Sequence, residues 1–430
     1  MASQKRKVAV LGAGPMGLAV AYQLVKDGFQ PVLFEADNRV GGMTASFDFG
    51  GLPIERYYHF HCTSDTGMIE VLQELGLESR LHWVHTKMAY YYGGAVHPWG
   101  NPLALLRFPG LNILQKLRAG IFLFLATKRN DWSSLDRLEA TSWMKRWMGE
   151  KTYDVLWRKL FDFKFYEYAE QLSAAWIWSR IRRLGRSRYN LFKEKLGYVD
   201  GGSQVLMEAM ADFIRTNGGT IHLGAPVQKV VIEAGKVRGV QIDGSVHVFE
   251  QVISTVPLPY VPRLMPDLPP DILGQFQAQE NIAVVCVIAK LHKPVSEYFW
   301  MNVNDPNMDI PGIVEYTNLR PLDHHIVYVP YYMPGEHPKF GDADEVFVQK
   351  VKSYLKTINP ALVDDDFIDV RVNRYRFAQP VCGQGFLETL PPVKLPVEGL
   401  LVADTSYYYP EDRGISESID FGRKMARMLL

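Results

Sequence analysis

The feature that most constrains the fold is a glycine-rich turn near the N-terminus, between a short apolar segment and a predicted helix. Residues 7–11 (KVAVL) form a β-branched apolar run typical of a buried parallel strand. Gly12, Gly14 and Gly17 follow, with Pro15 and Met16 between the last two, and then come small apolar residues. Such glycines let the backbone turn sharply and approach a pyrophosphate, which the N-terminus of the helix can bind. The pattern therefore predicts a phosphate-binding turn in an α/β fold.

An acidic residue at the end of the second predicted strand reduces the number of possible ligands. Residues 31–34 (PVLF) are followed by Glu35 and Ala36, and Glu35 stands 23 positions beyond Gly12. This is close to the roughly 20 positions expected for the acid that hydrogen-bonds a ribose hydroxyl. An acid without an adjacent arginine suits the unphosphorylated ribose of FAD or NAD better than that of NADP.

The residues that follow carry a family resemblance. Residues 35–42 read EADNRVGG, in which an acid is followed by Arg39 and by the pair Gly41 and Gly42. Here the chain resembles the FAD-binding superfamily of flavin amine oxidases, protoporphyrinogen oxidase, phytoene-type desaturases and UDP-galactopyranose mutase. The resemblance implies FAD, with the glycine pair close to its pyrophosphate. The sequence departs from the amine oxidase pattern at two positions, since amine oxidases usually have a basic residue where Asp37 stands and an arginine where Met43 stands.

The resemblance continues in the middle and at the C-terminal end. Residues 399–404 (GLLVAD) resemble a late strand whose acid, Asp404, approaches the ribityl chain. Residues 414–416 stand where the family begins a helix whose N-terminus faces the flavin, which would stabilise negative charge on the reduced ring. In between, the resemblance places the backbone of Val227 at the adenine. The cofactor-binding candidates are Gly12, Gly14, Pro15, Met16, Gly17, Glu35, Ala36, Arg39, Gly41, Gly42, Met43, Val227, Asp404, Gly414, Ile415 and Ser416.

The resemblance implies an α/β fold, α+β overall, with a discontinuous Rossmann-like FAD-binding domain of the glutathione reductase type. That domain would comprise residues 1–85, 195–275 and 391–430. A substrate domain would be inserted as residues 86–194, mainly helical, and residues 276–390, containing a mixed sheet. The apolar run 282–289 (IAVVCVIA) is predicted to be a buried strand of that sheet.

Four residues are candidates for catalysis. His59 and His61 lie in a segment that resembles a histidine motif of UDP-galactopyranose mutase, although the two histidines are one residue closer together here. On a strand, both rings would lie on one face; the alternative is that they are structural histidines. Tyr408 and Arg413 lie close to the predicted flavin contact. Amine oxidases usually carry a lysine at the start of the strand that begins here near Asn281, and its absence weakens an assignment as an amine oxidase.

The distribution of charge suggests partners. Lys plus Arg equals Asp plus Glu at 47 each, which excludes a grossly basic nucleic-acid binder. Residues 79–130 contain seven cations and no acid, and the segment 102–129 also contains leucines and phenylalanines. It is either a solvated basic face or an interfacial segment that makes a peripheral membrane contact. A second cluster, at Arg180, Arg182, Arg183, Arg186 and Arg188, could hold a diphosphate.

Several features bear on the compartment and on metals. The opening residues lack a signal-peptide pattern, and the longest uncharged apolar run considered, 119–127, is far short of the roughly 18 residues of a spanning helix. Three dispersed cysteines suggest a reducing cytoplasm, with the inner face of a membrane as the alternative place of action. No metal site is expected, because no third ligand accompanies the two histidines.

Three functions remain open at this stage. The first is an FAD-dependent oxidoreductase that accepts a hydride from a C–N or C–C bond of a bulky, partly apolar small molecule. The second is a flavin-dependent mutase or isomerase acting on a sugar nucleotide or lipid-linked sugar, favoured by the histidine segment and the arginine cluster. The third is a flavin-binding regulatory or assembly protein without catalysis.

Overall fold

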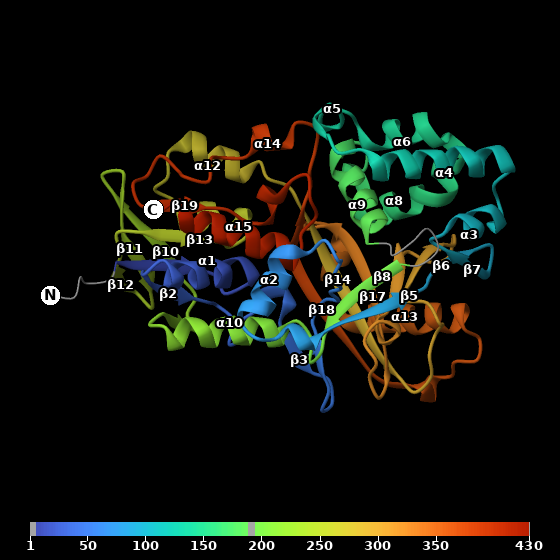
Figure 1. Ribbon diagram of the computed structural model, residues 1–430, viewed down its shortest axis with the longest axis horizontal. Coiled ribbons are helices and arrows are strands. Elements are labelled where there is room, and N and C mark those ends of the chain that lie inside the picture. Colours follow the sequence, from blue (N-terminus) through green and yellow to red (C-terminus); the bar gives the residue numbers. More distant parts are fainter. Residues whose placement is uncertain (1–5, 188–193, 430) are drawn as a thin grey trace.

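The computed structural model describes residues 6–187 and 194–429, which form a mixed helix-and-sheet molecule, as the sequence predicted (Figure 1). Its first sheet has five parallel strands in the order β19-β13-β1-β2-β9. These strands are β1 (Lys7–Leu11), β2 (Gln30–Phe34), β9 (Thr220–His222), β13 (Val252–Ser254) and β19 (Leu400–Val402). The sheet thus joins strands from distant parts of the chain, and β1 lies at its centre.

Helices pack closely on one face of this sheet. They are α1 (Pro15–Lys26), α2 (Thr66–Glu74), α10 (Gln204–Thr216) and α15 (Ile415–Arg427). The backbones of α1 and α15 approach each other closely, because a Cβ added at Gly422 would lie 2.5 Å from the Met16 carbonyl oxygen. Side chains on the opposite face of the sheet pack on a three-stranded meander and two helices. These elements are β10 (Lys229–Glu233), β11 (Lys236–Ile242), β12 (Ser245–Val248), α11 (Val261–Leu264) and α12 (Pro270–Gln277).

A second, seven-stranded sheet has the order β18-β14-β17-β16-β15-β6-β7. All its pairs are antiparallel except β15 with β6, so it is mixed. Its strands are β6 (Met88–Tyr92), β7 (Ala95–Trp99), β14 (Asn281–Leu291), β15 (Trp300–Asn304), β16 (Gly312–Glu315), β17 (His325–Pro334) and β18 (Phe367–Pro380). The predicted buried strand at 282–289 is confirmed, since every residue of β14 is buried. Helix α13 (Asp344–Ile358) covers one face.

A helical lobe lies beside this sheet, at the upper right of Figure 1. It consists of α3 (Pro102–Arg107), α4 (Ile113–Lys128), α5 (Ser133–Asp136), α6 (Ala140–Met148), α7 (Glu150–Tyr153), α8 (Lys159–Phe165) and α9 (Ala174–Arg186). Its core contains Trp143, Trp176 and Trp178. The strands β6 and β7, which precede these helices in the chain, join the seven-stranded sheet instead.

Short elements connect the lobes. The strands β3 (Ser46–Asp48) and β4 (Pro53–Glu55) form one hairpin, and β5 (Leu81–Thr86) pairs with β8 (Glu194–Val199). The small helix α14 (Phe386–Thr389) precedes β19. Among the described residues, no helix combines the length and the apolar character needed to cross a bilayer.

Candidate active site

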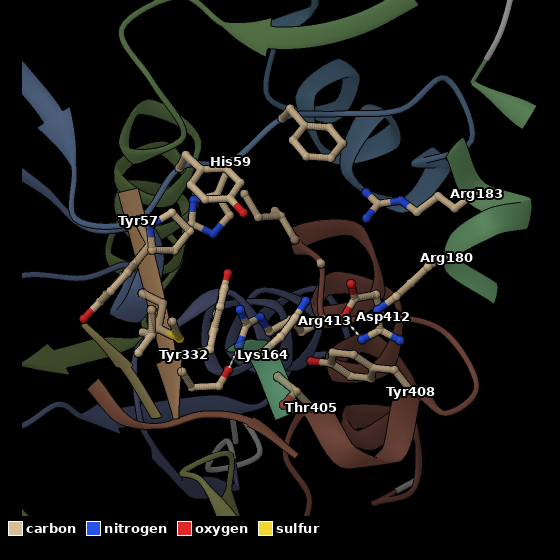
Figure 2. A pocket seen from close by; sticks show the side chains of 18 of the residues that line it. Tyr57, His59, Lys164, Arg180, Arg183, Tyr332, Thr405, Tyr408, Asp412 and Arg413 are labelled. Atoms are coloured by element: carbon tan, nitrogen blue, oxygen red, sulfur yellow. Dashed lines mark hydrogen bonds and ion pairs between the residues drawn. The ribbon is translucent and has the colours of Figure 1, made fainter. Parts of the chain in front are cut away.

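A cavity of about 1960 Å³ runs between the parallel sheet, the seven-stranded sheet and the helical lobe. One end is lined by the glycine-rich turn after β1, the middle by residues of β15, β17 and β18, and the other end by α4 and α9. Figure 2 shows side chains from residues 57–59, α8, α9, β17 and residues 405–413 converging on the middle of the cavity. Sequence-distant elements therefore form one continuous site.

The glycine turn has the shape that the sequence predicted. Gly12 has a φ of +95°, and a Cβ added at Gly17 would lie 1.9 Å from the Gly12 carbonyl oxygen. Gly14 is the N-cap of α1, Pro15 follows it, and no side chain caps this end of the helix. A Cβ added at Gly14 would meet no atom within 4 Å. The turn is thus an open cradle beneath uncapped helix amides, which suits a phosphate group.

Glu35 lies where β2 ends and lines the same end of the cavity, together with Ala36 and Val227. Its two carboxylate oxygens accept hydrogen bonds from the backbone N–H groups of Ala13, at 2.6 Å, and Asp37, at 2.9 Å. A carboxylate oxygen has more than one lone pair, so these bonds leave acceptor capacity for a hydroxyl group. In this structure Glu35 also holds the glycine turn against the end of β2.

The two residues of the second glycine pair, Gly41 and Gly42, have different positions relative to the cavity. Gly42 lines the cavity with a φ of +55°, and a Cβ there would lie 3.2 Å from the Gly14 Cα atom. Gly41 does not line the cavity; its N–H donates to the Ala13 carbonyl at 2.8 Å. Arg39 also lies outside it and donates to the Ser46 carbonyl. These two predicted contacts therefore lie behind the cavity wall in this structure.

Asp404 and the start of α15 close this region. The Asp404 carboxylate accepts from the backbone N–H groups of Leu258, at 2.9 Å, and Ser406, at 2.8 Å, and burial raises its pKa. Gly414, the N-cap of α15, and Ile415 line the cavity, and the N-cap glycine has no side chain to cap the helix. The Glu417 carboxyl group lies in the first turn against Gly414, and burial raises its pKa to about 7. Ser416 does not line it, because its hydroxyl accepts from the Met68 N–H at 3.2 Å. The remaining predicted cofactor residues that line the cavity are Pro15, Met16 and Met43.

The two histidines are brought to the cavity, but not on a strand. Residues 56–60 are irregular, and His61 forms a single bridge to Gly197, so the expected strand with both rings on one face is wrong. His59 lies 2.6 Å, between Nδ1 and Oε2, from buried Glu55. Burial would raise the pKa of Glu55, but its hydrogen bonds with His59 and Ser203 lower it. His59 is thus oriented by a carboxylate, whereas His61 is held through its backbone.

His61 should make stability depend on pH. Burial lowers the pKa of His61 to about 4, against about 6.5 in an unfolded chain. Between these two pH values the unfolded chain binds a proton at His61 that the folded protein does not bind. The free energy of unfolding therefore decreases as the pH falls from 6.5 to 4. We expect His61→Gln to remove about 3 kcal/mol of this pH dependence. Urea unfolding of both proteins at pH 4.5 and 7 measures it, and parallel losses of stability would contradict the assignment.

Tyr408 is the member of the 407–409 triplet that lines the cavity. Its hydroxyl donates to the Ser418 Oγ atom at 2.9 Å, and Ser418 in turn donates to the Gly414 carbonyl at 2.7 Å. The Tyr407 hydroxyl donates to the Pro391 carbonyl instead. Burial raises the pKa of Tyr408 far above its usual range, so this hydroxyl remains protonated. Its observed contacts support the start of α15.

A cationic cluster centres on Lys164 of α8, a residue that the sequence analysis did not single out (Figure 2). Lys164, Arg180 and Arg413 surround Asp412, whose Oδ1 accepts from Arg180 at 2.7 Å. The Lys164 ammonium makes no hydrogen bond to any described residue and lies 5.1 Å from the centre of the Tyr332 ring. Burial, followed by repulsion from Arg180, lowers the pKa of Lys164 to about 7. The available sequence signal was a lysine flanked by phenylalanines in the run FDFKF.

Only part of the predicted arginine cluster faces the cavity. Arg180 and Arg183 line the cavity, whereas Arg182 and Arg186 do not. Arg183 pairs with Asp65 at 3.0 Å, Arg182 pairs with Glu411 at 3.1 Å, and Arg186 donates to Asn130. Arg188 lies outside the described residues. The described arginines thus have protein partners, and the diphosphate site remains a prediction.

Aromatic side chains form the middle of the cavity. Tyr57, Tyr58, Trp300 and Tyr332 line it, while Tyr331 points to the other face of the sheet and packs on Phe347. The alternation of side chains along β17 separates the two neighbouring tyrosines. Lys290, the lysine at the far end of β14, donates to the Phe49 carbonyl at 3.1 Å and does not reach the cavity.

The far end of the cavity is apolar. Its wall includes Leu106, Leu117, Ile121, Leu123 and Phe124 from the α3 and α4 region, facing Ile177, Ile181 and Leu184 of α9. A site that combines a phosphate cradle, an aromatic middle and an aliphatic end can hold a nucleotide cofactor together with a second, largely apolar molecule.

Comparison with known proteins agrees with this geometry. The family model described as "Flavin containing amine oxidoreductase" matches residues 17–411. A 15-cis-phytoene desaturase from Synechococcus elongatus is 22% identical over 286 residues, covering 61% of this chain and 60% of that protein. Protoporphyrinogen oxidase 2 from Arabidopsis thaliana is 29% identical over 156 residues, covering 35% of this chain and 31% of that protein. The chain spans about half to three fifths of the desaturases that it matches.

Among solved structures, reduced UDP-galactopyranose mutase aligns with a TM-score of 0.74 at 16% identity, covering 99% of this chain and 95% of that one. At this identity the likeness establishes the fold. The family match extends over most of the chain, from Gly17 at the glycine turn to Glu411 just before the segment that leads into α15. The chain therefore belongs to the flavin-containing amine oxidoreductase family.

Proposed function

We propose that the protein binds FAD and uses it to accept a hydride from a C–N or C–C bond of a bulky, partly apolar small molecule. The observation that carries this proposal is the single cavity that joins the glycine cradle to an aliphatic groove. The bound flavin would supply the two-electron acceptor, so the protein's tasks are orientation, polarity and exclusion of water. The 15-cis-phytoene desaturases among the similar proteins favour a C–C bond as the one from which the hydride is taken.

The extent of the cradle favours FAD over a mononucleotide. The cavity continues past the N-terminus of α1 to Glu35, Ala36 and Val227. This extension has an acid able to accept from a ribose and room for an adenine beyond the phosphates.

On this proposal the FAD-binding domain comprises residues 1–85, 195–275 and 391–430. The substrate domain comprises residues 86–194 and 276–390.

The polar residues near the middle of the cavity have distinct proposed roles. Lys164 is suited to exchange a proton with the substrate, because its pKa of about 7 lets it carry or release a proton at neutral pH. The N-terminus of α15 would favour negative charge on a reduced ring while the Glu417 carboxyl group in its first turn, whose pKa burial raises to about 7, is protonated. Tyr58 and Tyr332 offer flat, largely apolar surfaces for an unsaturated or amine-bearing substrate. His59, held by Glu55, is a second candidate for proton transfer.

An absorbance spectrum of the purified protein, combined with identification of the released cofactor, tests the proposal. We expect a flavin spectrum, release of FAD on denaturation, and bleaching by anaerobic dithionite. Rapid return of colour in air would indicate an oxidase, and slow return a desaturase or dehydrogenase. A colourless protein that takes up neither FAD nor FMN would contradict the cofactor assignment, and release of FMN alone would contradict the role of Glu35.

A redox-neutral mutase or isomerase is the second candidate, and the cationic cluster favours it. Three cations, Lys164, Arg180 and Arg413, face the cavity around the single carboxylate of Asp412, which leaves positive charge for an anionic ligand. We expect a mutase to convert a sugar nucleotide such as UDP-galactopyranose only when the flavin is reduced, without net oxidation. Flavin bleaching by an apolar substrate, with no sugar isomerisation, would exclude this candidate.

A further inference from the structure

One face of the helical lobe exposes apolar side chains that a water-facing surface does not require. We call the following residues the α3–α4 surface: Leu103, Leu106, Ile113, Leu114, Leu117, Ile121, Phe124 and Leu125, all of which are exposed. Leu114 is 73% exposed and Ile121 is 58% exposed. Single exposed apolar residues are ordinary, but a contiguous group of this kind marks an interaction site.

Helix α4 is apolar on two sides, and the fold covers only one of them. Ala119, Phe122 and Ala126 are buried, and the helix packs on α6 and α9. A surface helix normally has a polar face opposite its buried stripe. Here the opposite face consists of Leu114, Leu117 and Ile121. The exposed side of α4 therefore has the apolar composition of a helix face that is buried against a partner.

The cations around this surface indicate what covers it. Arg107, Lys116, Arg118, Lys128 and Arg129 lie on or beside α3 and α4, and none forms an ion pair with a described carboxylate. Residues 79–130 contain no acid that could balance them. A second copy of the chain would bring two sets of these cations together, which is unfavourable. An anionic lipid surface offers both the missing negative charge and an apolar layer.

The α3–α4 surface is also continuous with the cavity. Leu106, Leu117, Ile121 and Phe124 are exposed on the outside and line the cavity as well, and Lys116 and Lys128 lie at the same opening. An apolar molecule that leaves a bilayer at this surface would therefore enter the aliphatic end of the cavity without crossing water. Substrate access and surface docking use the same residues.

We propose that the α3–α4 surface docks onto an anionic lipid bilayer, so that an apolar substrate passes from the membrane directly into the cavity. The protein would bind at the interface, with its apolar side chains inserted and its cations at the headgroups. Only the direction of substrate entry rests on the proposed function. The docking itself is measured without turnover, so its failure and a failure of hydride transfer are distinguishable.

Co-sedimentation with vesicles tests the docking. We expect the flavin-loaded protein to bind vesicles of phosphatidylcholine with phosphatidylglycerol more tightly than vesicles of phosphatidylcholine alone, and less tightly at high salt. Ile113→Glu with Leu114→Glu should weaken binding at least about tenfold, because two apolar contacts are lost. Arg107→Gln should weaken binding to the anionic vesicles about fivefold and leave binding to neutral vesicles unchanged.

The variants were chosen to separate docking from folding and from the cavity. Ile113, Leu114 and Arg107 do not line the cavity, and acidic residues are favourable in the first turn of a helix such as α4. Val248→Glu is the matched control, because Val248 is 80% exposed on β12, at the other end of the molecule from α4 (Figure 1). It should bind as the wild type does.

Three outcomes would overturn the proposal. In the first, the wild-type protein sediments with neither type of vesicle. In the second, it sediments equally well with and without the Ile113 and Leu114 substitutions. In the third, sedimentation equilibrium shows a dimer that these substitutions dissociate while no vesicle binding occurs, which would assign the surface to another copy of the chain.

Discussion

Replacing Gly14 with valine should yield a folded protein that has lost its flavin. Gly14 has an extended backbone with φ −71° and ψ 178°, which valine adopts readily, and its added Cβ would meet no atom within 4 Å. The new side chain would instead fill the cradle below the first turn of α1. Loss of two charge-assisted hydrogen bonds at about 1.5 kcal/mol each corresponds to an affinity for FAD about 100-fold lower. Titration of the apoprotein with FAD measures this loss.

Two other glycine substitutions make this result interpretable. Gly274→Val introduces the same side chain on the exposed side of α12, outside the cavity and with no atom within 4 Å, and should retain FAD. Gly17→Ala should instead prevent folding or strongly destabilise the protein, because its Cβ would lie 1.9 Å from a backbone oxygen. If Gly14→Val remained fully yellow, the glycine cradle would not be the cofactor site.

Replacing Lys164 with methionine should lower turnover about 10²- to 10⁴-fold while leaving the flavin bound, because a proton-transfer group is removed. Lys159→Met is the matched control on the same helix, since Lys159 does not line the cavity. A substrate identified by its bleaching of the flavin would supply the assay. Unchanged turnover in Lys164→Met would assign this lysine to packing alone.

The ionisation of Lys164 can be measured without a substrate. Because the pKa of Lys164 is about 7, its amine is protonated and unreactive only below about pH 7. An ordinary lysine stays protonated and unreactive up to about pH 10. Competitive labelling with acetic anhydride, quantified by mass spectrometry, should therefore show Lys164 becoming reactive around pH 7. At that pH its neutral fraction would exceed that of an ordinary lysine by about a thousandfold.

Two neighbouring substitutions should move this midpoint in opposite directions. Arg180→Met should raise the pKa of Lys164, because it removes a repelling cation and leaves Asp412 less engaged. Asp412→Asn should lower it further, because it removes the attracting carboxylate. A midpoint that shifts in the same direction in both variants, or in neither, would show that these charges do not control the ionisation of Lys164.

The parts of the site that could be read from the sequence are those formed by consecutive residues. The turn at Gly12, Gly14 and Gly17 depends on backbone freedom and helix direction, which are local properties, and its geometry is as expected. The buried strand β14 was evident because every one of its positions is covered, so an unbroken apolar run is required. The helix that begins at Ile415 was expected from the family resemblance of residues 414–416, and the structure has it as α15.

Local pattern could not decide which neighbouring side chains face the cavity. His59 and His61 were expected on a strand, but the segment is irregular and the partners of its histidines, Glu55 and Gly197, set their positions. Tyr331 and Tyr332 were equivalent in the sequence until the register of β17 placed one ring on each face of the sheet. Arg39 and Ser416 hydrogen-bond to groups outside the cavity, although their neighbours line it.

The sequence by itself determined the glycine turn, a buried central strand and an unbalanced basic segment. Only the tertiary structure placed Lys164 among Arg180, Asp412 and Arg413, and joined the exposed face of α4 to the aliphatic end of the cavity. The physical reason is that a turn or a buried strand is specified by the covalent neighbours of each residue. A lowered lysine pKa or a continuous cavity depends instead on distances between side chains far apart in the chain, which the packing of the lobes sets.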